Sequence, residues 1–434
     1  DAKTDDDDDR CTITGPAGAS VIASTSAASL ALKNLVLTGG ERGVHVDATV
    51  VGGGAYTLAL TNVETRGHTE DGVDVAVDGA DAFTMLFNDV VVHDSGDEGV
   101  SVQLADTSTV DVSLRNVRIS ASGHHGALFL DTATGARTYT VHESWFDANQ
   151  GSGLRIDGAN NVDGGPLAVR IDETTSTNNR FDGVELLQDG DSFDVAIDDV
   201  VLDNNGHSGV YVESIADDGS PLSFKLEDAV VSNNELSGVN VTHSGLGDVA
   251  AGVLRVVADN NGGSGVLVTD GVAGTNTGDV TAMLTLVTAR SNGDSNVRVV
   301  ENSSGDLATT LVDVYTSLAG TDQNIRVFED GAGDATHTLS NVTALGAAAS
   351  DGIELRERNV GLLTVTFAGA VRASHNNAVG VVLDGELRLA ATPDTRAMEV
   401  SGASNVAGTA NGSGHLIDYR HDSGVSFLTV PNNS

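Results

Sequence analysis

A short alternation of apolar and polar residues recurs about every 28 residues through most of this chain. Each repeat starts at a Gly or Asn that is followed by an apolar residue, and a second apolar residue stands two positions later. Such alternation predicts a β-strand with one buried face. The steps are Gly43-Val44, Gly72-Val73, Gly99-Val100, Gly126-Ala127, Gly153-Leu154, Gly183-Val184, Gly209-Val210, Gly238-Val239, Gly265-Val266, Asn296-Val297, Asn324-Ile325, Gly352-Ile353 and Gly380-Val381. We therefore expect thirteen units that each supply one strand in the same register.

Further apolar positions appear when the units are aligned on this Gly. Residues twelve, nine and seven positions before it are mostly apolar, as with Ile197, Val200 and Leu202 before Gly209. Each unit thus predicts three short strands separated by bends. Three strands cannot bury an apolar face alone, so the units are expected to stack and share one core.

An Asn column stands four residues before the Gly in six successive units. Asn tolerates left-handed backbone, and stacked Asn amides can hydrogen-bond from one coil to the next. We therefore predict a structural role for this column and for the Gly column. The residues concerned are Asn149, Asn179, Asn205, Asn234, Asn261 and Asn292, with Gly209, Gly238 and Gly265.

The repeats resemble a known family in segments such as VAIDDVVLDNNGHSGVYV (195–212) and LSFKLEDAVVSNNELSGVNV (222–241). The family is the right-handed parallel β-helix, the pectate-lyase-like solenoid. The resemblance implies an all-β fold, a right-handed parallel β-helix of about 13 coils with roughly 28 residues per coil. Lyases, hydrolases, epimerases, phage tailspikes, adhesins and surface fibres share this fold, so the resemblance leaves the function open.

The unbroken period predicts one elongated repeat domain rather than several globular ones. Residues 1–29 read as an acidic arm with a partial first coil, 30–390 as the β-helix repeats, and 391–434 as irregular terminal coils. The segment GHLIDYRHDSGVSFLTV (414–430) resembles one more coil. Neither end has the amphipathic period of a capping helix, which leaves three interpretations: the chain is cut from a longer solenoid, its ends pair with other copies, or irregular loops cap it. Of these we expect pairing with other copies, between residues near 11–40 of one chain and 400–430 of the next.

Charge narrows the set of partners. The chain has 62 acidic and 22 basic residues, a net charge of −40, which argues against nucleic acid and anionic membrane as partners. No apolar run is long enough to predict insertion into a membrane. Two interpretations of the acidity stay open: a hydrated coat adapted to high salt, or binding of Ca²⁺ by carboxylates on neighbouring loops. The Ca²⁺ candidates, each also compatible with simple turn chemistry, are Asp189 with Asp191, Asp217 with Asp218, and Asp330 with Asp334.

Catalytic candidates occupy the outward position between the two buried strand residues. Arg155 beside Glu185, and Arg326 beside Glu354, could form a base and an acid in a cleft. The alternative is an ion pair between adjacent coils. Trp145, the single tryptophan, is expected in the core or as a loop anchor.

The histidines indicate a metal site less strongly than the Asp-rich loops do. His93, His124, His125 and His142 stand at different offsets from the Gly, so they are not expected to converge on one zinc ion.

These observations favour a structural role over an enzymatic one. The sequence predicts an extracellular or cell-surface structural and adhesive β-helix protein that self-associates through its ends into a filament. One alternative is a carbohydrate-active enzyme, a polysaccharide lyase or hydrolase of the pectate-lyase-like class. Another is a spike or binding module of a larger secreted protein, with a carbohydrate or cell-surface partner.

Overall fold

The computed structural model describes residues 10–158, 164–215, 218–271, 278–358, 361–385, 398–403, 406–413, 415–421 and 425–431. It divides the chain into two compact units. Unit 1 comprises Asp1–Asp191 with Asp199–Val201, and unit 2 comprises Ser192–Asp198 with Leu202–Ser434. In each unit the strands form two parallel sheets, here called sheet A and sheet B. No α-helix occurs among the described residues, and no described helix could cross a membrane.

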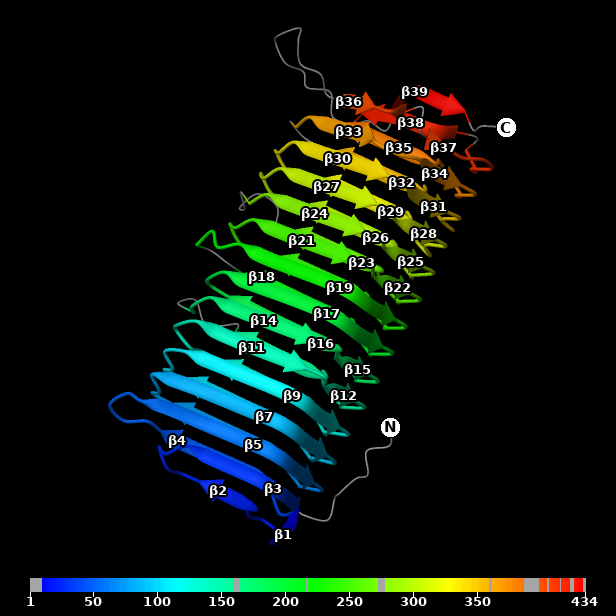
Figure 1. The fold of residues 1–434 in the computed structure, drawn as a ribbon. Coiled ribbons are helices and arrows are strands. Elements are labelled where there is room, and N and C mark those ends of the chain that lie inside the picture. Colours follow the sequence, from blue (N-terminus) through cyan, green and yellow to red (C-terminus); the bar gives the residue numbers. More distant parts are fainter. Residues whose placement is uncertain are drawn as a thin grey trace. The chain divides into compact units, whose positions relative to one another are not determined.

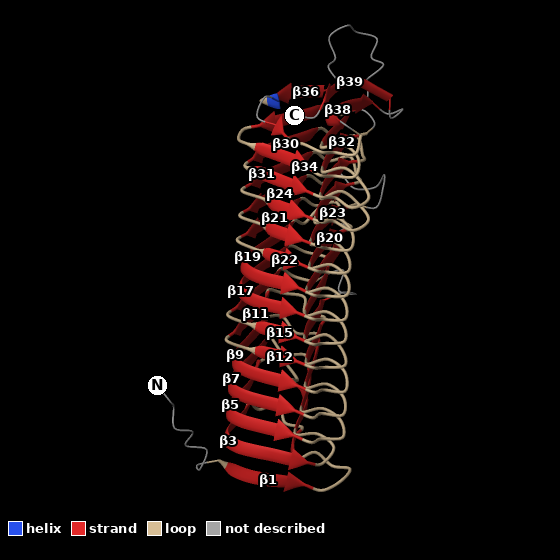
Figure 2. Ribbon diagram, turned by 90° about the vertical axis from the view of Figure 1, so that its right-hand side faces the viewer, coloured by secondary structure: helices blue, strands red, loops and turns tan. Residues whose placement is uncertain are grey.

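In unit 1, successive coils place equivalent strands side by side (Figures 1 and 2). Sheet A contains β1 (Cys11–Gly15), β3 (Leu30–Gly39), β5 (Ala55–Arg66), β7 (Ala82–His93), β9 (Val110–Ser120), β11 (Arg137–His142), β12 (Trp145–Asp147), β14 (Leu167–Asp172) and β15 (Thr175–Thr177). Sheet B contains β2 (Ile22–Ser24), β4 (Val44–Thr49), β6 (Val73–Asp78), β8 (Val100–Ala105), β10 (Ala127–Asp131), β13 (Leu154–Gly158) and β16 (Val184–Asp189).

Unit 2 repeats the same arrangement. Strand β17 (Phe193–Asp203) belongs mostly to this unit. Sheet A continues with β19 (Leu222–Ser232), β21 (Val249–Leu254), β22 (Val257–Asp259), β24 (Val280–Thr285), β25 (Thr288–Arg290), β27 (Leu307–Val312), β28 (Tyr315–Ser317), β30 (Ala335–Ser340), β31 (Val342–Leu345), β33 (Leu363–Phe367), β34 (Val371–Ser374), β36 (Met398–Ser401) and β37 (Val406–Ala407). Sheet B contains β18 (Val210–Ile215), β20 (Val239–His243), β23 (Val266–Asp270), β26 (Val297–Glu301), β29 (Ile325–Glu329), β32 (Ile353–Glu357), β35 (Val381–Gly385), β38 (His415–His421) and β39 (Val425–Pro431).

The predicted fold is confirmed: the chain is an all-β parallel solenoid of about 13 turns with about 28 residues per turn. The predicted register is confirmed as well, since Val239 pairs with Val210 on one side and Val266 on the other. All three side chains are 0% exposed, because the inward positions of successive coils pack on one another.

The three short strands predicted for each unit are arranged differently. The first two belong to one sheet, and in β5, β7 and β9 they form a single strand of 11 or 12 residues. A left-handed residue bends each of these strands, for example Asn62 with φ 51° and Asn116 with φ 49°. One residue in this conformation redirects the backbone while the strand on either side keeps its ladder with the neighbouring coil.

The Asn column forms a buried ladder of amides. In unit 2, Asn234 Nδ2 donates to Asn261 Oδ1 at 3.0 Å, and Asn261 Nδ2 donates to Asn292 Oδ1 at 3.0 Å. The left-handed backbone falls one residue earlier than expected, at Asn233 and Asn260, both with φ 57°. The turn is thus made by the preceding residue, which leaves the ladder Asn free to point inward.

The Gly column is explained by close approach of neighbouring backbone. A Cβ on Gly238 would lie 2.6 Å from the carbonyl oxygen of Gly265 and 2.8 Å from Asn261 Nδ2. Any larger residue would therefore displace both the next coil and the Asn ladder.

The segment 414–430 does not add another coil. Strand β38 pairs in parallel with β35, but β39 folds back and pairs antiparallel with β38 (Figure 1). Only three residues separate the two strands, whereas a parallel crossover needs about a dozen or more. The short connection therefore dictates a hairpin.

Candidate functional site

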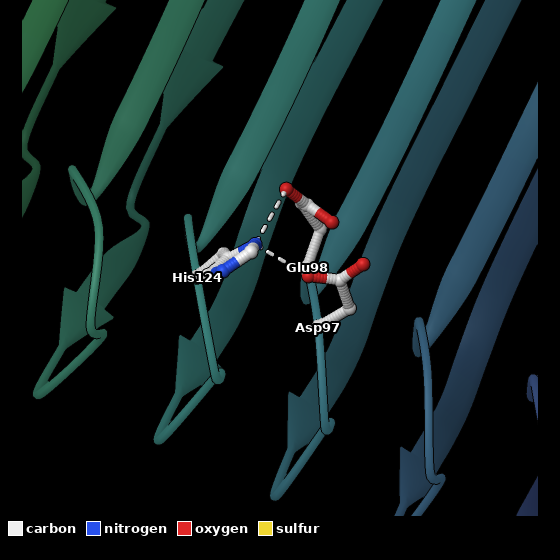
Figure 3. Close-up of side chains that lie close together, drawn as sticks. All are labelled: Asp97, Glu98 and His124. Carbon is white, nitrogen blue, oxygen red and sulfur yellow. Dashed lines mark ion pairs between the residues drawn. The ribbon is translucent and has the colours of Figure 1, made fainter.

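Two carboxylates and one imidazole meet where the chain turns into sheet B of unit 1 (Figure 3). Asp97 and Glu98 precede β8, and His124 occupies the equivalent turn of the next coil before β10. His124 Nδ1 lies 2.5 Å from Asp97 Oδ1 and 3.6 Å from Glu98 Oε1. Equivalent residues of adjacent coils are about one strand spacing, 4.8 Å, apart, which is why residues so distant in sequence converge.

The electrostatics of this group depend on the preceding coil. Burial, together with Asp97 and Asp71, raises the pKa of Glu98 to about 8. Burial and Asp74 raise the pKa of Asp71 to about 6. Arg42 supplies positive charge there, with its Nε 3.1 Å from Asp74 Oδ2 and 3.6 Å from Asp71 Oδ2. Glu98 therefore keeps its proton at neutral pH.

Asp97, Glu98 and His124 could hold a metal ion. Their ligand atoms all lie within 4.8 Å of one another, and carboxylate and imidazole groups are ligands that Zn²⁺ and similar ions accept. A second such group within the described residues is His142, Asp172 and Glu173, where His142 Nδ1 lies 3.0 Å from Asp172 Oδ2. An ion pair between a charged histidine and the acids, with no metal ion, would also account for the distances in each group.

Two other histidines named in the sequence analysis, His93 and His125, do not belong to this group. His93 Nδ1 contacts Asp94 Oδ2 at 2.8 Å. His125 Nδ1 accepts a hydrogen bond from the backbone N–H of Ser152 at 3.0 Å, and burial, followed by Arg155, lowers the pKa of His125 to about 4. His125 is thus a neutral structural acceptor.

Arg155 and Glu185 lie one coil apart in unit 1, as their positions in the repeat require. Arg155 Nη1 donates to Glu185 Oε1 at 2.8 Å, and Ser152 Oγ donates to Glu185 Oε2 at 2.7 Å. Arg155 also contacts Asp157 Oδ2 at 2.5 Å. Both Glu185 oxygens already have donors, so this carboxylate is held in an ion-pair network.

Arg326 and Glu354 are less closely paired. Arg326 Nε lies 3.9 Å from Glu354 Oε2, while Arg326 Nη1 contacts Asp322 and Gln323 Nε2 donates to Glu354 Oε2 at 2.6 Å. Glu354 is 8% exposed, and burial raises its pKa to about 7 despite Arg326. A carboxyl group so covered has little access to a polymeric substrate.

The Ca²⁺ candidates form no cluster of three ligand side chains among the described residues. Asp218 accepts hydrogen bonds from its own turn, from Ser220 N and Oγ, both at 3.0 Å. Asp330 Oδ1 lies 3.2 Å from Arg358 Nη1, and Asp334 Oδ1 accepts from the backbone N–H of Leu362 at 2.8 Å. Asp189 and Asp191 lie half-buried at the end of β16, and Asp217 lies outside the described residues.

Asp334 is one member of a ladder that the sequence analysis missed. The backbone N–H of each Asp donates to the carboxylate of the Asp one coil earlier: Asp279 to Asp248 at 2.9 Å, Asp306 to Asp279 at 2.8 Å, and Asp334 to Asp306 at 2.8 Å. Aligning the units at this turn would have exposed the column. These acids therefore stabilise coil stacking.

Trp145 is not in the core. It is 37% exposed on sheet A of unit 1, because the alternation of β12 turns Phe146, at 0% exposed, inward instead. The Arg118 guanidinium carbon lies 4.6 Å from the centre of the Trp145 ring. Both residues line a hollow of about 390 Å³ together with Ile119, Ser120 and Asp147.

Comparison with known proteins adds no family assignment. No protein-family model matches the chain, and no curated protein matches it significantly.

Proposed function

We propose that this chain is a structural and adhesive solenoid of an extracellular or cell-surface assembly, in which copies stack end to end. The observation that carries the proposal is the edge strand β1. It pairs with β3 on one side, and its residues Cys11 to Thr14 are exposed. Cys11 pairs with Leu35, which occupies an inward position of the coil. No described strand pairs with the other edge of β1, and an edge whose inward positions already match the coil register is a template for another strand.

The matching surface lies at β37 in unit 2. Leu35 and Val342 each follow a left-handed bend residue, Asn34 and Asn341, and so occupy the same position of the coil. Val342 pairs with Val371, which pairs with Val406. Cys11 and Val406 are therefore equivalent positions.

A β1 strand placed on β37 of another copy, in the coil register, would set Thr12 opposite Ala407. Both residues are exposed within this chain. This contact is confined to sheet A, because β39 already pairs with β38 in sheet B. Such a contact is heterologous, so it would propagate as a fibre unless it closed into a ring.

Cross-linking tests this register. The variant Thr12→Cys with Ala407→Cys, in a Cys11→Ser background, should yield a ladder of covalent multimers on mild oxidation. Equivalent residues of stacked coils lie about 4.8 Å apart, within the range of a disulfide. The matched control, Thr14→Cys with Ala407→Cys, displaces the thiol by two residues, to about 8 Å, and should stay monomeric. Equal cross-linking of the two variants, or monodisperse monomers of both at high concentration, would refute the proposal.

Saccharide binding is a second candidate function, favoured by the hollow at Trp145. An exposed indole offers a face for a sugar ring, and Arg118 and Asp147 offer donors and acceptors for its hydroxyl groups. The surface is a hollow lined by five residues rather than a long groove.

The single tryptophan makes this second function directly measurable. Titration with neutral oligosaccharides such as cellohexaose and maltohexaose should change the fluorescence of Trp145, because ring stacking alters its solvent exposure. Asp147→Asn should weaken that response, whereas Asp203→Asn, outside the hollow, should not. An unchanged emission spectrum at millimolar sugar would rule out this candidate.

A further inference from the structure

One face of unit 2 is built from strands whose outward residues are all uncharged. Five successive strands of sheet A form it, β21, β24, β27, β30 and β33, which Figure 1 shows one above another with nearly parallel arrows. Strand pairing aligns their outward residues into rows, such as Met283, Thr310 and Thr338. Every outward residue of these five strands is Ala, Gly, Leu, Met, Val, Ser or Thr. We call this surface the neutral face.

The neutral face differs from the surface beside it. The chain has a net charge of −40, and 62 of its 434 residues are acidic. The two sheet A strands that precede the neutral face carry charges at outward positions: β17 has Asp194 and Asp198, and β19 has Lys225 and Glu227. Solvation alone therefore does not account for five strands without an outward charge.

The neutral face also exposes apolar side chains. Met283, in β24, is 54% exposed, and Leu286, at the bend that follows this strand, is 48% exposed. Leu286 has a left-handed backbone, with φ 55°, at a bend where three other coils of unit 2 have Asp228, Asp313 and Asn341. Asp and Asn adopt this conformation more readily than Leu. A leucine there costs free energy, which contact with an apolar partner would offset.

The size of the neutral face fits a small protein–protein interface. Five strands about 4.8 Å apart, each about 20 Å long, cover about 500 Å² on one copy and about 1,000 Å² on two copies. That total is the lower limit for a specific interface. Two β-sheets pack face to face when their side chains interdigitate, about 10 Å apart. Thr, Ala and Val side chains are small enough for this spacing.

Charge indicates which partner the neutral face accepts. A basic partner would be attracted by the acidic surface, so it would not require a face without acids. An acidic partner would, because carboxylates that face one another across about 10 Å lie within the Debye length of about 10 Å at 0.1 M salt and repel. The outward residues of the five strands also include no aromatic ring on which a sugar could stack. A second copy of this chain is acidic and presents a neutral face of its own.

We propose that the neutral face is a docking surface for a second copy of this chain, with the faces of the two copies packed on one another about a two-fold axis. Such an isologous contact is complete with two copies, unlike the contact between β1 and β37. It lies on the flank of unit 2, so it could join two filaments side by side as well as two single chains. The contact does not depend on the end-to-end stacking proposed above.

Oxidation of Met283 measures this contact in the unmodified chain. Hydrogen peroxide oxidises an exposed methionine faster than a covered one, and peptide mass spectrometry gives the rate. In about 2 M NaCl, where repulsion between copies is screened, we expect the rate at Met283 to fall at least about threefold as the chain concentration rises from about 1 μM to about 1 mM. In about 0.05 M NaCl this protection should disappear. Stacking of β1 on β37 does not cover Met283, because β24 is paired on both sides within its own sheet.

Thr336→Asp places a charge on the neutral face and should abolish the protection of Met283. Thr336 is exposed in β30, so its substitution should leave the fold intact. Thr281→Asp, at an exposed position of β24, is an independent second variant. The matched control is Thr138→Asp, which changes an exposed Thr at the same place in the six-residue strand β11 of unit 1. This control should keep the wild-type protection.

The end-to-end contact is tested separately from this one. Thr336→Asp, added to the Thr12→Cys and Ala407→Cys variant, should leave the ladder of covalent multimers unchanged. A ladder without protection of Met283 would therefore retain the filament and remove the lateral contact, and the reverse result would do the opposite.

Three results would overturn the lateral contact. One is a Met283 oxidation rate that is independent of chain concentration in the wild type. Another is wild-type protection in both Thr336→Asp and Thr281→Asp, which would place the contact elsewhere. Protection that appears only when a neutral oligosaccharide such as cellohexaose is added would show that a sugar occupies the face instead.

Discussion

Replacing Val239 by Asp is expected to destabilise unit 2 by about 4 kcal/mol or more. Val239 is 0% exposed and lies in register between Val210 and Val266. An Asp here would place a carboxylate among apolar neighbours on both sides, without the turn N–H groups that cap buried glutamates such as Glu301. Chemical denaturation followed by circular dichroism measures the loss.

Asn240→Asp is the matched control for this substitution. It places the same acid at the adjacent residue of β20, whose side chain is half-buried and points outward. Its effect should stay within about 0.5 kcal/mol, as for most surface substitutions. If Val239→Asp unfolded at the wild-type midpoint, the inward register of the strand would be refuted.

Raising the pH from 6.5 to 8 should lower the melting temperature markedly in chelator-treated protein. The pKa of Glu98 is about 8 and that of Glu329 about 10, in both cases chiefly because of burial. A buried acid with a raised pKa holds its proton in the folded state after the unfolded chain has lost it. The stabilisation of the folded state by this proton is complete at pH values below the ordinary pKa of the acid. It declines as the pH rises toward the pKa that the acid has in the folded state. In this range each such acid lowers the free energy of unfolding by about 1.4 kcal/mol for every unit that the pH rises.

Three histidines have the opposite effect on stability and set the lower limit of this pH range; one of them is His68, whose pKa is lowered chiefly by burial. Burial lowers the pKa of His337 to about 3, and burial with Arg155 lowers that of His125 to about 4. The unfolded chain binds protons at these histidines below about pH 6.5, so they reduce stability only on the acid side. The slope between pH 6.5 and 8 therefore reports the buried acids.

Glu329→Gln should flatten this slope, because the amide does not titrate. Glu235→Gln changes an exposed acid of unit 2 and should leave the slope as in the wild type. A melting temperature independent of pH between 6.5 and 8 would contradict the protonated state of the buried carboxyl groups.

The repeat period determined the strands, their register and the Asn and Gly columns. Each coil has nearly the same length, so residues at equal offsets must stack, and alternation shows which of them face inward. Val239 and Asn261 were placed correctly from spacing alone. The period also predicted that Arg155 and Glu185 would be neighbours.

Only the tertiary structure decided what happens where strands end. Trp145 was expected in the core or as a loop anchor, but the short strand β12 places Phe146 in the core and leaves the indole 37% exposed on the sheet. Asp97, Glu98 and His124 meet because turns of adjacent coils superimpose, and the turns after β26 and β29 supply the backbone N–H groups that cap the inward-facing Glu301 and Glu329. Alternation reports side-chain direction within a strand. Beyond its last residue the direction depends on local turn geometry and on the hydrogen bonds available there, which no single period encodes.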